Sequence, residues 1–134
     1  MSVYLNAPAL PFNTRQWDKL LRNMLAAVDL APDQVNLYLE RDGRLAELNR
    51  AFMACPGPTN ILSFPGNSKD LLGEICIGYD TLRREAHLYG QSLKTHAVFL
   101  LAHGLTHVLG YNHGQEMDKI STQLTKIALE PELL

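Results

Sequence analysis

The sequence predicts an α+β fold, a small β-sheet covered by about five helices. Apolar residues repeat at every second position in some segments and at every third or fourth in others, the periods of strands and helices. The two kinds of segment are interspersed without the strict alternation of an α/β fold. With 134 residues, 46% of them hydrophobic and 19% charged, the chain can bury a core without staples, so we expect one domain over residues 1–134.

The first helix is predicted between Asn13 and Pro32. Asn13 and Gln16 have the spacing of a capping box, in which each side chain binds the backbone N–H of the other residue. Pro32 is expected to end the helix, because proline disfavours helical geometry at the residue before it. The apolar face would consist of Trp17, Leu20, Leu21, Met24, Leu25 and Val28.

Three strands and a short helix are predicted in the middle of the chain. Residues 35–40 alternate apolar and polar side chains, the pattern of a half-buried strand. A turn at residues 42–43 should lead into a short helix, which the Cys-Pro-Gly-Pro run at 55–58 ends. Residues 59–65 and 72–79 are short β-type runs bounded by Pro and Gly. The apolar side of the short helix would carry Leu45, Leu48 and Phe52.

Three further helices are predicted in the C-terminal half. Residues 80–90 have the pattern of a capped helix. A long apolar helix should follow over residues 93–109, with Gly110 closing it. The inward side chains of the first would be Leu82, Ala86 and Tyr89, and those of a terminal helix Met117, Ile120, Leu124 and Ile127.

The composition and charge of the chain limit which cellular compartment and which binding partners can be expected. The net charge of −2 gives no global basic field, so any nucleic-acid contact must come from a local patch. Cys55 and Cys76 have no paired spacing, which favours a reduced, cytoplasmic chain over a disulfide framework. The N-terminal residues lack the features of a signal peptide, and no apolar run is long enough to span a membrane.

The run HGLTHVLGYNHG, residues 103–114, contains three candidate metal ligands. On a helix, His103 and His107 lie one turn apart on the same face, where two imidazoles can share a metal ion. Gly110 is suited to the left-handed conformation that ends a helix, so the chain can turn there and return His113 as a third ligand. Three protein ligands leave one position for water, which is the pattern of a catalytic metal site.

The histidines also allow other interpretations. A lone histidine on an apolar helix is usually a packed core residue, and we expect this of His96, while His87 receives no role. The spacing also matches that of metzincin proteases, but these carry Glu directly after the first histidine as general base. Here that position is Gly104. Since general base catalysis commonly contributes about 10²–10⁴-fold, a peptidase is the weaker alternative.

Four segments together resemble the YbeY family of bacterial metal-dependent endoribonucleases. HGLTHVLGYNH is similar to the family's HGxLHLxGYDH signature, ELNRAF to LNxxYR, PTNILSFP to PT(D/N)VLSFP, and LLGEICI to LGDIxI. The resemblance covers about residues 33 to 130. It implies a mixed sheet with the metal site in a cleft at the end of a central helix. His103, His107 and His113 would hold one zinc ion per chain.

The resemblance also implies the activity and the partners. The resemblance implies a single-strand-type endoribonuclease that acts in ribosomal RNA maturation and ribosome quality control. The expected substrate is an rRNA precursor, and ribosomal subunits or assembly factors are further candidate partners. Zinc lowers the pKa of a bound water to about 7, and RNA also brings its own 2′-OH as a nucleophile. The sequence does not choose between these two nucleophiles and names no general base.

Three positions depart from the family pattern. Asn112 stands where the family usually has Asp, and an amide brings no charge to a ligand imidazole. Thr106 replaces an apolar residue, a packing change. Met53 stands where the family has an Arg that could bind a phosphate bidentately. Arg50, one turn earlier, is the candidate contributor to catalysis in its place, although we favour a solvated surface arginine.

Several residues allow two interpretations. Thr59 and Ser63 could present hydroxyls to the cleft or serve strand packing, and Glu74 could support the metal site or lie at a sheet edge. Cys55 is expected to be incidental. A basic rim could be formed by Arg83, Arg84 and Lys94. Two other functions stay open: a metallopeptidase that lacks the usual Glu, and a non-catalytic, metal-stabilised module that binds ribosomal components.

Overall fold

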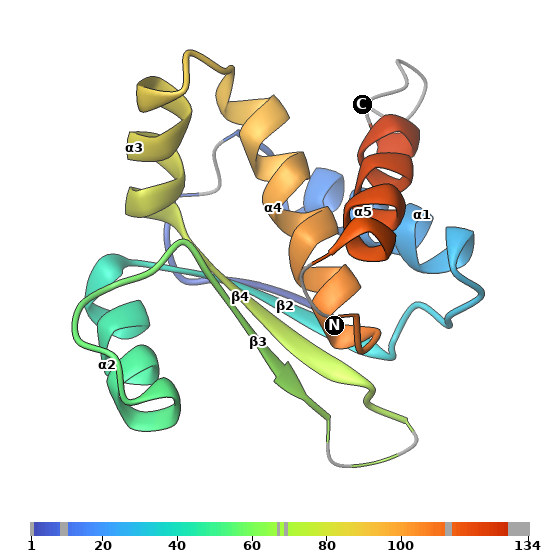
Figure 1. Cartoon of the computed structure of the whole chain (residues 1–134), viewed down its shortest axis with the longest axis horizontal. Coiled ribbons are helices and arrows are strands. Elements are labelled where there is room, and N and C mark those ends of the chain that lie inside the picture. The colour runs from blue at the N-terminus through green and yellow to red at the C-terminus, as the bar shows by residue number, and fades with distance from the viewer. Residues whose placement is uncertain (1, 9–10, 67, 69, 112–113, 129–134) are drawn as a thin grey trace.

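The computed structural model describes residues 2–8, 11–66, 68, 70–111 and 114–128, without the side chains of residues 127 and 128. Its four strands form one sheet in the order β1-β2-β4-β3 (Figure 1). β1 (Val3–Leu5), β2 (Val35–Glu40) and β4 (Gly73–Gly78) run parallel, while β3 (Ile61–Pro65) pairs antiparallel with β4. The sheet is therefore mixed, and together with the helices it confirms the predicted α+β class.

The helices cover the two faces of the sheet unequally. α1 (Thr14–Ala27), α4 (Leu93–Val108) and α5 (Gln115–Ala128) pack together on one face, whereas α2 (Asp42–Met53) lies on the other (Figure 1). α3 (Tyr79–Leu88) follows β4 directly and packs against α4. The described part of the chain thus has the five helices that the sequence predicts.

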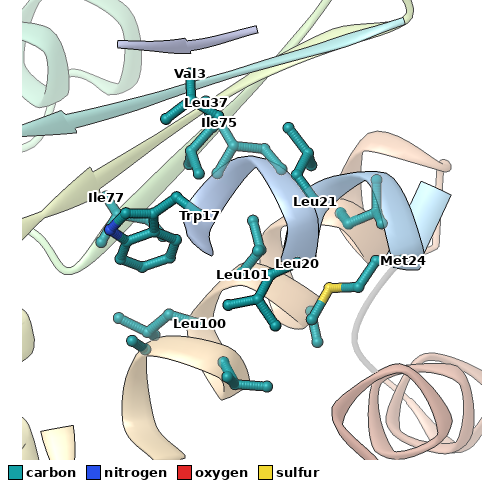
Figure 2. Packing of buried hydrophobic residues seen from close by; sticks show 14 of the residues in the cluster. Val3, Trp17, Leu20, Leu21, Met24, Leu37, Ile75, Ile77, Leu100 and Leu101 are labelled. Atoms are coloured by element: carbon teal, nitrogen blue, oxygen red, sulfur yellow. The ribbon is translucent and has the colours of Figure 1, made fainter. Parts of the chain in front are cut away.

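The main core lies between the sheet and α1 and α4. In Figure 2, apolar side chains of α1 lie among those of the sheet and of α4. The predicted capping box is present: Gln16 N–H donates to Asn13 Oδ1 at 2.8 Å, and Asn13 N–H donates to Gln16 Oε1 at 3.0 Å. α4 contributes side chains on most of its circumference, since its central position buries it on several sides. The labelled residues of this core are Val3, Trp17, Leu20, Leu21, Met24, Leu37, Ile75, Ile77, Leu100 and Leu101.

Two predicted helix boundaries were wrong. α1 ends at Ala27 rather than near Pro32, because Asp29 adopts the left-handed conformation (φ 60°) and Leu30 N–H donates to Leu25 O at 2.9 Å, a Schellman-type ending. α2 begins at Asp42, so the expected turn is the first turn of that helix.

Two side chains predicted to point inward are exposed, and one strand was missed. Phe52 is 66% exposed and Tyr89 is 59% exposed. Tyr89 follows the last turn of α3, where the helical period no longer decides its direction. β1 has only three residues, too few for a period-2 pattern to stand out.

Both cysteine thiols are free, as predicted. Of the helices that the structure describes, none combines the length and apolarity that crossing a bilayer requires.

Candidate metal centre

His103 and His107 project from the C-terminal half of α4 as predicted. Their ring centroids are 4.8 Å apart and the ring planes meet at 83°. Both side chains are half-buried, so they combine a supported position with access from solvent. α4 starts at Ser92, whose Oγ accepts a hydrogen bond from Thr95 N–H at 3.1 Å. Its buried turns then hold the histidine pair on a rigid part of the molecule.

The end of α4 has the geometry that the sequence predicts for Gly110. This residue has φ 93°, and its N–H donates to His107 O at 2.9 Å. Tyr111 N–H donates to Thr106 O at 3.3 Å. These two bonds define a Schellman motif, which turns the chain sharply after the helix. Asn112 and His113 come next in the chain, and both lie outside the described residues.

A cavity of about 530 Å³ opens beside the histidine pair. One wall is the length of β3, an edge strand of the sheet, and the opposite wall is the end of α4. Ser63 is part of the β3 wall, and its Oγ donates to Gly104 O at 3.2 Å, which joins β3 to α4. The described lining consists of Met53, Asn60, Ile61, Leu62, Ser63, Phe64, Pro65, His103, His107, Val108 and Gly110.

Close packing explains why glycine follows the first histidine. A Cβ added to Gly104 would lie 2.5 Å from Ile61 Cδ1, 3.0 Å from Ile75 Cγ2 and 3.4 Å from Ser63 Oγ. Gly104 is buried against the sheet, so a glutamate here would lose water contact among apolar side chains, and the end of the Ile61 side chain would have to move. The packing at this position therefore disfavours the peptidase's general base.

The donor chemistry of the pair fits a zinc-like ion. Two imidazoles one helical turn apart are a usual half of a zinc site. Within the described ranges, no group of three or more His, Cys, Asp or Glu side chains is placed to hold a metal. The described structure thus supplies two of the three predicted ligands, and the complete set with His113 stays a prediction.

Met53, which the resemblance places at the family's arginine position, does face the cavity. It is 45% exposed at the end of α2 and belongs to the lining. Arg50 is exposed and is not among the described lining residues, which favours the solvated arginine. Cys55 is exposed beyond α2, where its Sγ lies 3.3 Å from Met53 O, and it is likewise outside the described lining.

Glu74 lies away from the histidines. Its side chain hydrogen-bonds to Tyr38 on the face of the sheet that α2 partly covers, and burial together with Glu74 raises the pKa of Tyr38 to about 12. This contact disfavours a role at the metal site, and the sheet-edge interpretation was wrong, because β4 is an inner strand of the sheet. Of the other uncertain residues, Ser63 lines the cavity, Thr59 is half-buried just before β3, and Thr106 is fully buried with its Oγ1 donating to Ala102 O.

Of the three residues of the predicted basic rim, one is paired with a carboxylate. Arg84 forms an ion pair with Asp42 at 2.8 Å, and the Arg83 guanidinium lies 5.9 Å from the centre of the Tyr79 ring. Lys94 is exposed in the first turn of α4. Arg84 therefore links α3 to α2, the Arg83 contact lies within α3, and none of the three residues is in the described cavity lining.

Sequence reasoning missed a hydrogen-bonded chain that leads to the cavity. His96 is 3% exposed; its Nε2 lies 2.9 Å from Glu85 Oε1 and its Nδ1 lies 3.2 Å from Gln91 Oε1. Asn60 Nδ2 donates to both oxygens of Glu85 at 3.1 and 3.3 Å, and Asn60 lines the cavity. Because the four residues come from separate segments, no local spacing could reveal them. The burial predicted for His96 is confirmed.

Comparisons with known proteins identify relatives of this chain. A sequence model of the family described as Endoribonuclease YbeY matches residues 6–128. A protein of Nitratidesulfovibrio vulgaris named Endoribonuclease YbeY is 38% identical over 141 residues, covering 90% of this chain and 87% of its own. A protein of Lawsonia intracellularis with the same name is 39% identical, covering 86% and 85%.

A solved structure agrees with the fold. The solution structure of a Thermotoga maritima protein superimposes with a TM-score of 0.65, covering 93% of this chain and 86% of that one, at 18% sequence identity. At that identity the match shows the fold alone, and the family rests on the sequence matches. Together with the four sequence segments, these matches show that the chain belongs to the YbeY family.

Proposed function

We propose that this chain is a zinc-dependent endoribonuclease that processes ribosomal RNA precursors in the cytoplasm and takes part in ribosome quality control. His103, His107 and His113 would hold one zinc ion. The observation that carries the proposal is the pair of half-buried imidazoles, one helical turn apart, in the wall of an open cavity. The shared name of the relatives, Endoribonuclease YbeY, supplies the reaction class.

The metal would supply positive charge to the phosphoryl group and the bound water, and the chain would orient the side chains that hold the metal. A zinc ion held by three imidazoles acts as a Lewis acid on a phosphoryl oxygen and lowers the pKa of a bound water to about 7. The chain fixes the His103 ring between Phe99, with centroids 6.0 Å apart, and His107. The bond between Ser63 and Gly104 holds the β3 wall at a set distance from α4. Such supports fix the direction of ligand side chains.

The cavity's chemistry suits RNA better than a peptide. Among its described lining residues there is no Asp or Glu, so no carboxylate stands ready to activate a metal-bound water for peptide hydrolysis. Lack of a carboxylate also avoids repulsion of a phosphate. RNA cleavage does not require a metal-bound water as nucleophile, because the substrate's own 2′-OH can take that role. The packing at Gly104 adds to the case against the peptidase.

One observation favours the non-catalytic alternative. The described lining contains no Lys or Arg, and Met53 occupies the position of the family's arginine. Positive charge that would stabilise a pentavalent phosphorane must then come from the metal or from outside the described lining. A metal-stabilised module that binds ribosomal components without cutting RNA is therefore the second candidate.

A single assay panel separates the candidates. The zinc-loaded protein is incubated with a structured rRNA-precursor fragment and with a casein-derived peptide, each with and without chelator. His107→Ala serves as the test variant and His87→Ala, which changes an exposed histidine on α3, as its matched control. We expect chelator-sensitive RNA cleavage by the wild type and the control only. Peptide cleavage alone would support the peptidase, and RNA binding without cleavage would support the binding module.

A further inference from the structure

An aromatic side chain is exposed one helical turn before the first metal-binding histidine. Within α4, all of whose residues are described, only Lys94 and Phe99 have exposed side chains. Phe99 is 44% exposed although the rest of the helix is largely committed to the core. The solvent-exposed part of a phenylalanine side chain contributes little to the free energy of folding, because it is not removed from water. Its position beside the cavity calls for another explanation.

Phe99 stands in a row of rings that ends at the cavity. Its ring centroid is 5.8 Å from that of His96 and 6.0 Å from that of His103, and the planes are near-parallel, at 19° and 28°. His107 continues the row at 4.8 Å from His103. At the other end, Tyr89 contacts His96 edge-on at 5.7 Å and is 59% exposed. The row thus runs from the end of α3 to the histidine pair.

The position of the row is fixed by the hydrogen-bond contacts of His96. His96 is buried, and both of its ring nitrogens lie within hydrogen-bond distance of side chains, those of Glu85 and Gln91. Its ring therefore has a fixed orientation, and Phe99 lies against it and against His103. An aromatic platform that is already ordered loses little conformational entropy when a flat ligand stacks on it.

We propose that Phe99 is a stacking platform for an unpaired nucleobase of the substrate RNA, with Tyr89 extending the platform away from the cavity. Proteins that bind single-stranded nucleic acid combine charged grooves with exposed aromatic rings, on which bases of any sequence stack. Here the net charge is −2 and the described cavity lining has no Lys or Arg, so stacking must supply a larger share of the affinity. A base on Phe99 would place its neighbouring phosphodiester next to His103.

This inference rests on the proposed function, and binding rather than cleavage tests it. The zinc-loaded protein is titrated into a fluorescent 2′-O-methyl oligouridylate of about ten nucleotides, checked for intactness on a gel. The variants are Phe99→Ala, Phe99→Leu and Phe99→Tyr. Phe52→Ala is the matched control, since Phe52 is an exposed phenylalanine (66%) on the helix that covers the other face of the sheet.

We expect Phe99→Ala and Phe99→Leu to raise the Kd about 5- to 100-fold, the range for losing one base–aromatic stack. Phe99→Tyr, which keeps the ring, and Phe52→Ala should stay within about twofold of wild type. The salt dependence should be the same for all variants, because stacking releases no counterions. An oligonucleotide of the same length with abasic sites throughout should bind wild type and Phe99→Ala equally.

The outcomes separate this inference from the proposed function. Wild-type affinity in a folded Phe99→Ala variant, checked by thermal melt, would overturn the stacking platform and leave the endoribonuclease proposal standing. An equal loss on the abasic strand would also overturn it, since Phe99 would then act without a base. A wild-type protein that does not bind the single strand at all would likewise overturn the stacking platform, and the cleavage panel would still decide the endoribonuclease proposal.

Discussion

The two faces of the sheet differ in how much apolar surface is buried on them, and the candidate site contains side chains from helices on both faces. On the face of α1, α4 and α5, a continuous core holds most of the buried apolar side chains that the structure describes. On the face of α2, the buried cluster in the described chain is Leu45, Leu62 and Cys76. The face covered by α1, α4 and α5, here called the deep face, carries the histidines on α4. The face covered by α2, here called the shallow face, carries Met53.

The difference matches two separate requirements of the site, the rigid placement of metal ligands and contact with the substrate. A metal ligand must be held within a fraction of an ångström, and a helix packed on several sides meets that need. A side chain that contacts substrate tolerates more variation, and α2 is anchored by fewer buried groups. Burial on the shallow face still suppresses chemistry at Cys76, because it raises the pKa of this thiol to about 12 and keeps it protonated.

The largest effect is expected from Gly104→Glu, which would restore the peptidase motif on the deep face. The new side chain meets Ile61 and Ile75 and buries a carboxylate without a partner. We expect the free energy of unfolding to fall by more than about 3 kcal/mol, measured by urea denaturation.

The control for this change is Gly43→Ala in α2, where an added Cβ meets nothing within 4 Å. It should be neutral or stabilise by about 0.5–1 kcal/mol, because alanine loses less conformational entropy in a helix. A Gly104→Glu variant that is as stable as wild type and cleaves casein would show that the wall has room for the peptidase's base.

A smaller effect is expected from Asp80→Asn, which tests how α2 is held on the shallow face. The Asp80 carboxylate accepts from Asp42 N–H at 2.9 Å, so it caps α2 from another helix, and it pairs with Arg41 at 3.1 Å. Its loss should lower the free energy of unfolding by about 1–2 kcal/mol. Asp18→Asn, which breaks an exposed ion pair with Arg22 on α1, should have an effect of about 0.5 kcal/mol or less.

The Asp80 effect should depend on pH in a defined direction. The hydrogen bond from Asp42 N–H and the charge of Arg41 lower the pKa of Asp80 below its ordinary value. The carboxylate therefore stabilises the fold fully above that ordinary value, about pH 4, and loses this contribution as the pH falls through the lowered pKa. Urea denaturation of wild type and Asp80→Asn should show a difference that is constant near neutrality and shrinks in acid. A difference that grows in acid would contradict the assigned contacts.

The smallest effect on stability, but a clear one on binding, is expected from Met53→Arg. Met53 is 45% exposed, so the change should alter the free energy of unfolding by less than about 0.5 kcal/mol. An arginine facing the cavity can bind a phosphate, which should steepen the slope of log affinity against log salt by about 0.7–0.9. RNA cleavage should rise with it.

Ala51→Arg is the matched control, because it adds the same charge to the same helix at an exposed position outside the described cavity lining. Fluorescence anisotropy at several salt concentrations compares the slopes. If Met53→Arg and Ala51→Arg change the slope equally, the charge acts at a distance and Met53 does not meet the RNA.

The sequence predicted the elements that repeat a strong local period. α4, its ending at Gly110, the capping box of α1 and the strand at 35–40 were all recognisable, because neighbouring residues determine them. The exposure of Phe52 was not predictable, since it depends on how little of the sheet α2 covers. β1 was missed because its pairing with β2 is set by tertiary contacts.

For the site, the sequence predicted the histidine pair on one helix face and a position for Met53 at the cleft, and both placements are confirmed. It could not reveal that Asn60, Glu85 and His96 form one hydrogen-bonded chain, because the contacts span 11 and 25 positions. Phe99 did carry a signal, a large aromatic four residues before His103. In an apolar run it was indistinguishable from a core residue until its exposure was known.

The central claim is that the histidine pair on the deep face, with His113, holds the metal on which RNA cleavage depends. Elemental analysis of protein purified without chelator tests it most directly. We predict about one zinc per chain in wild type and in His87→Ala, and almost none in His103→Ala, His107→Ala or His113→Ala, with each fold checked by circular dichroism. A wild-type protein without a stoichiometric transition metal, or a His107→Ala variant that keeps its zinc, would contradict the claim.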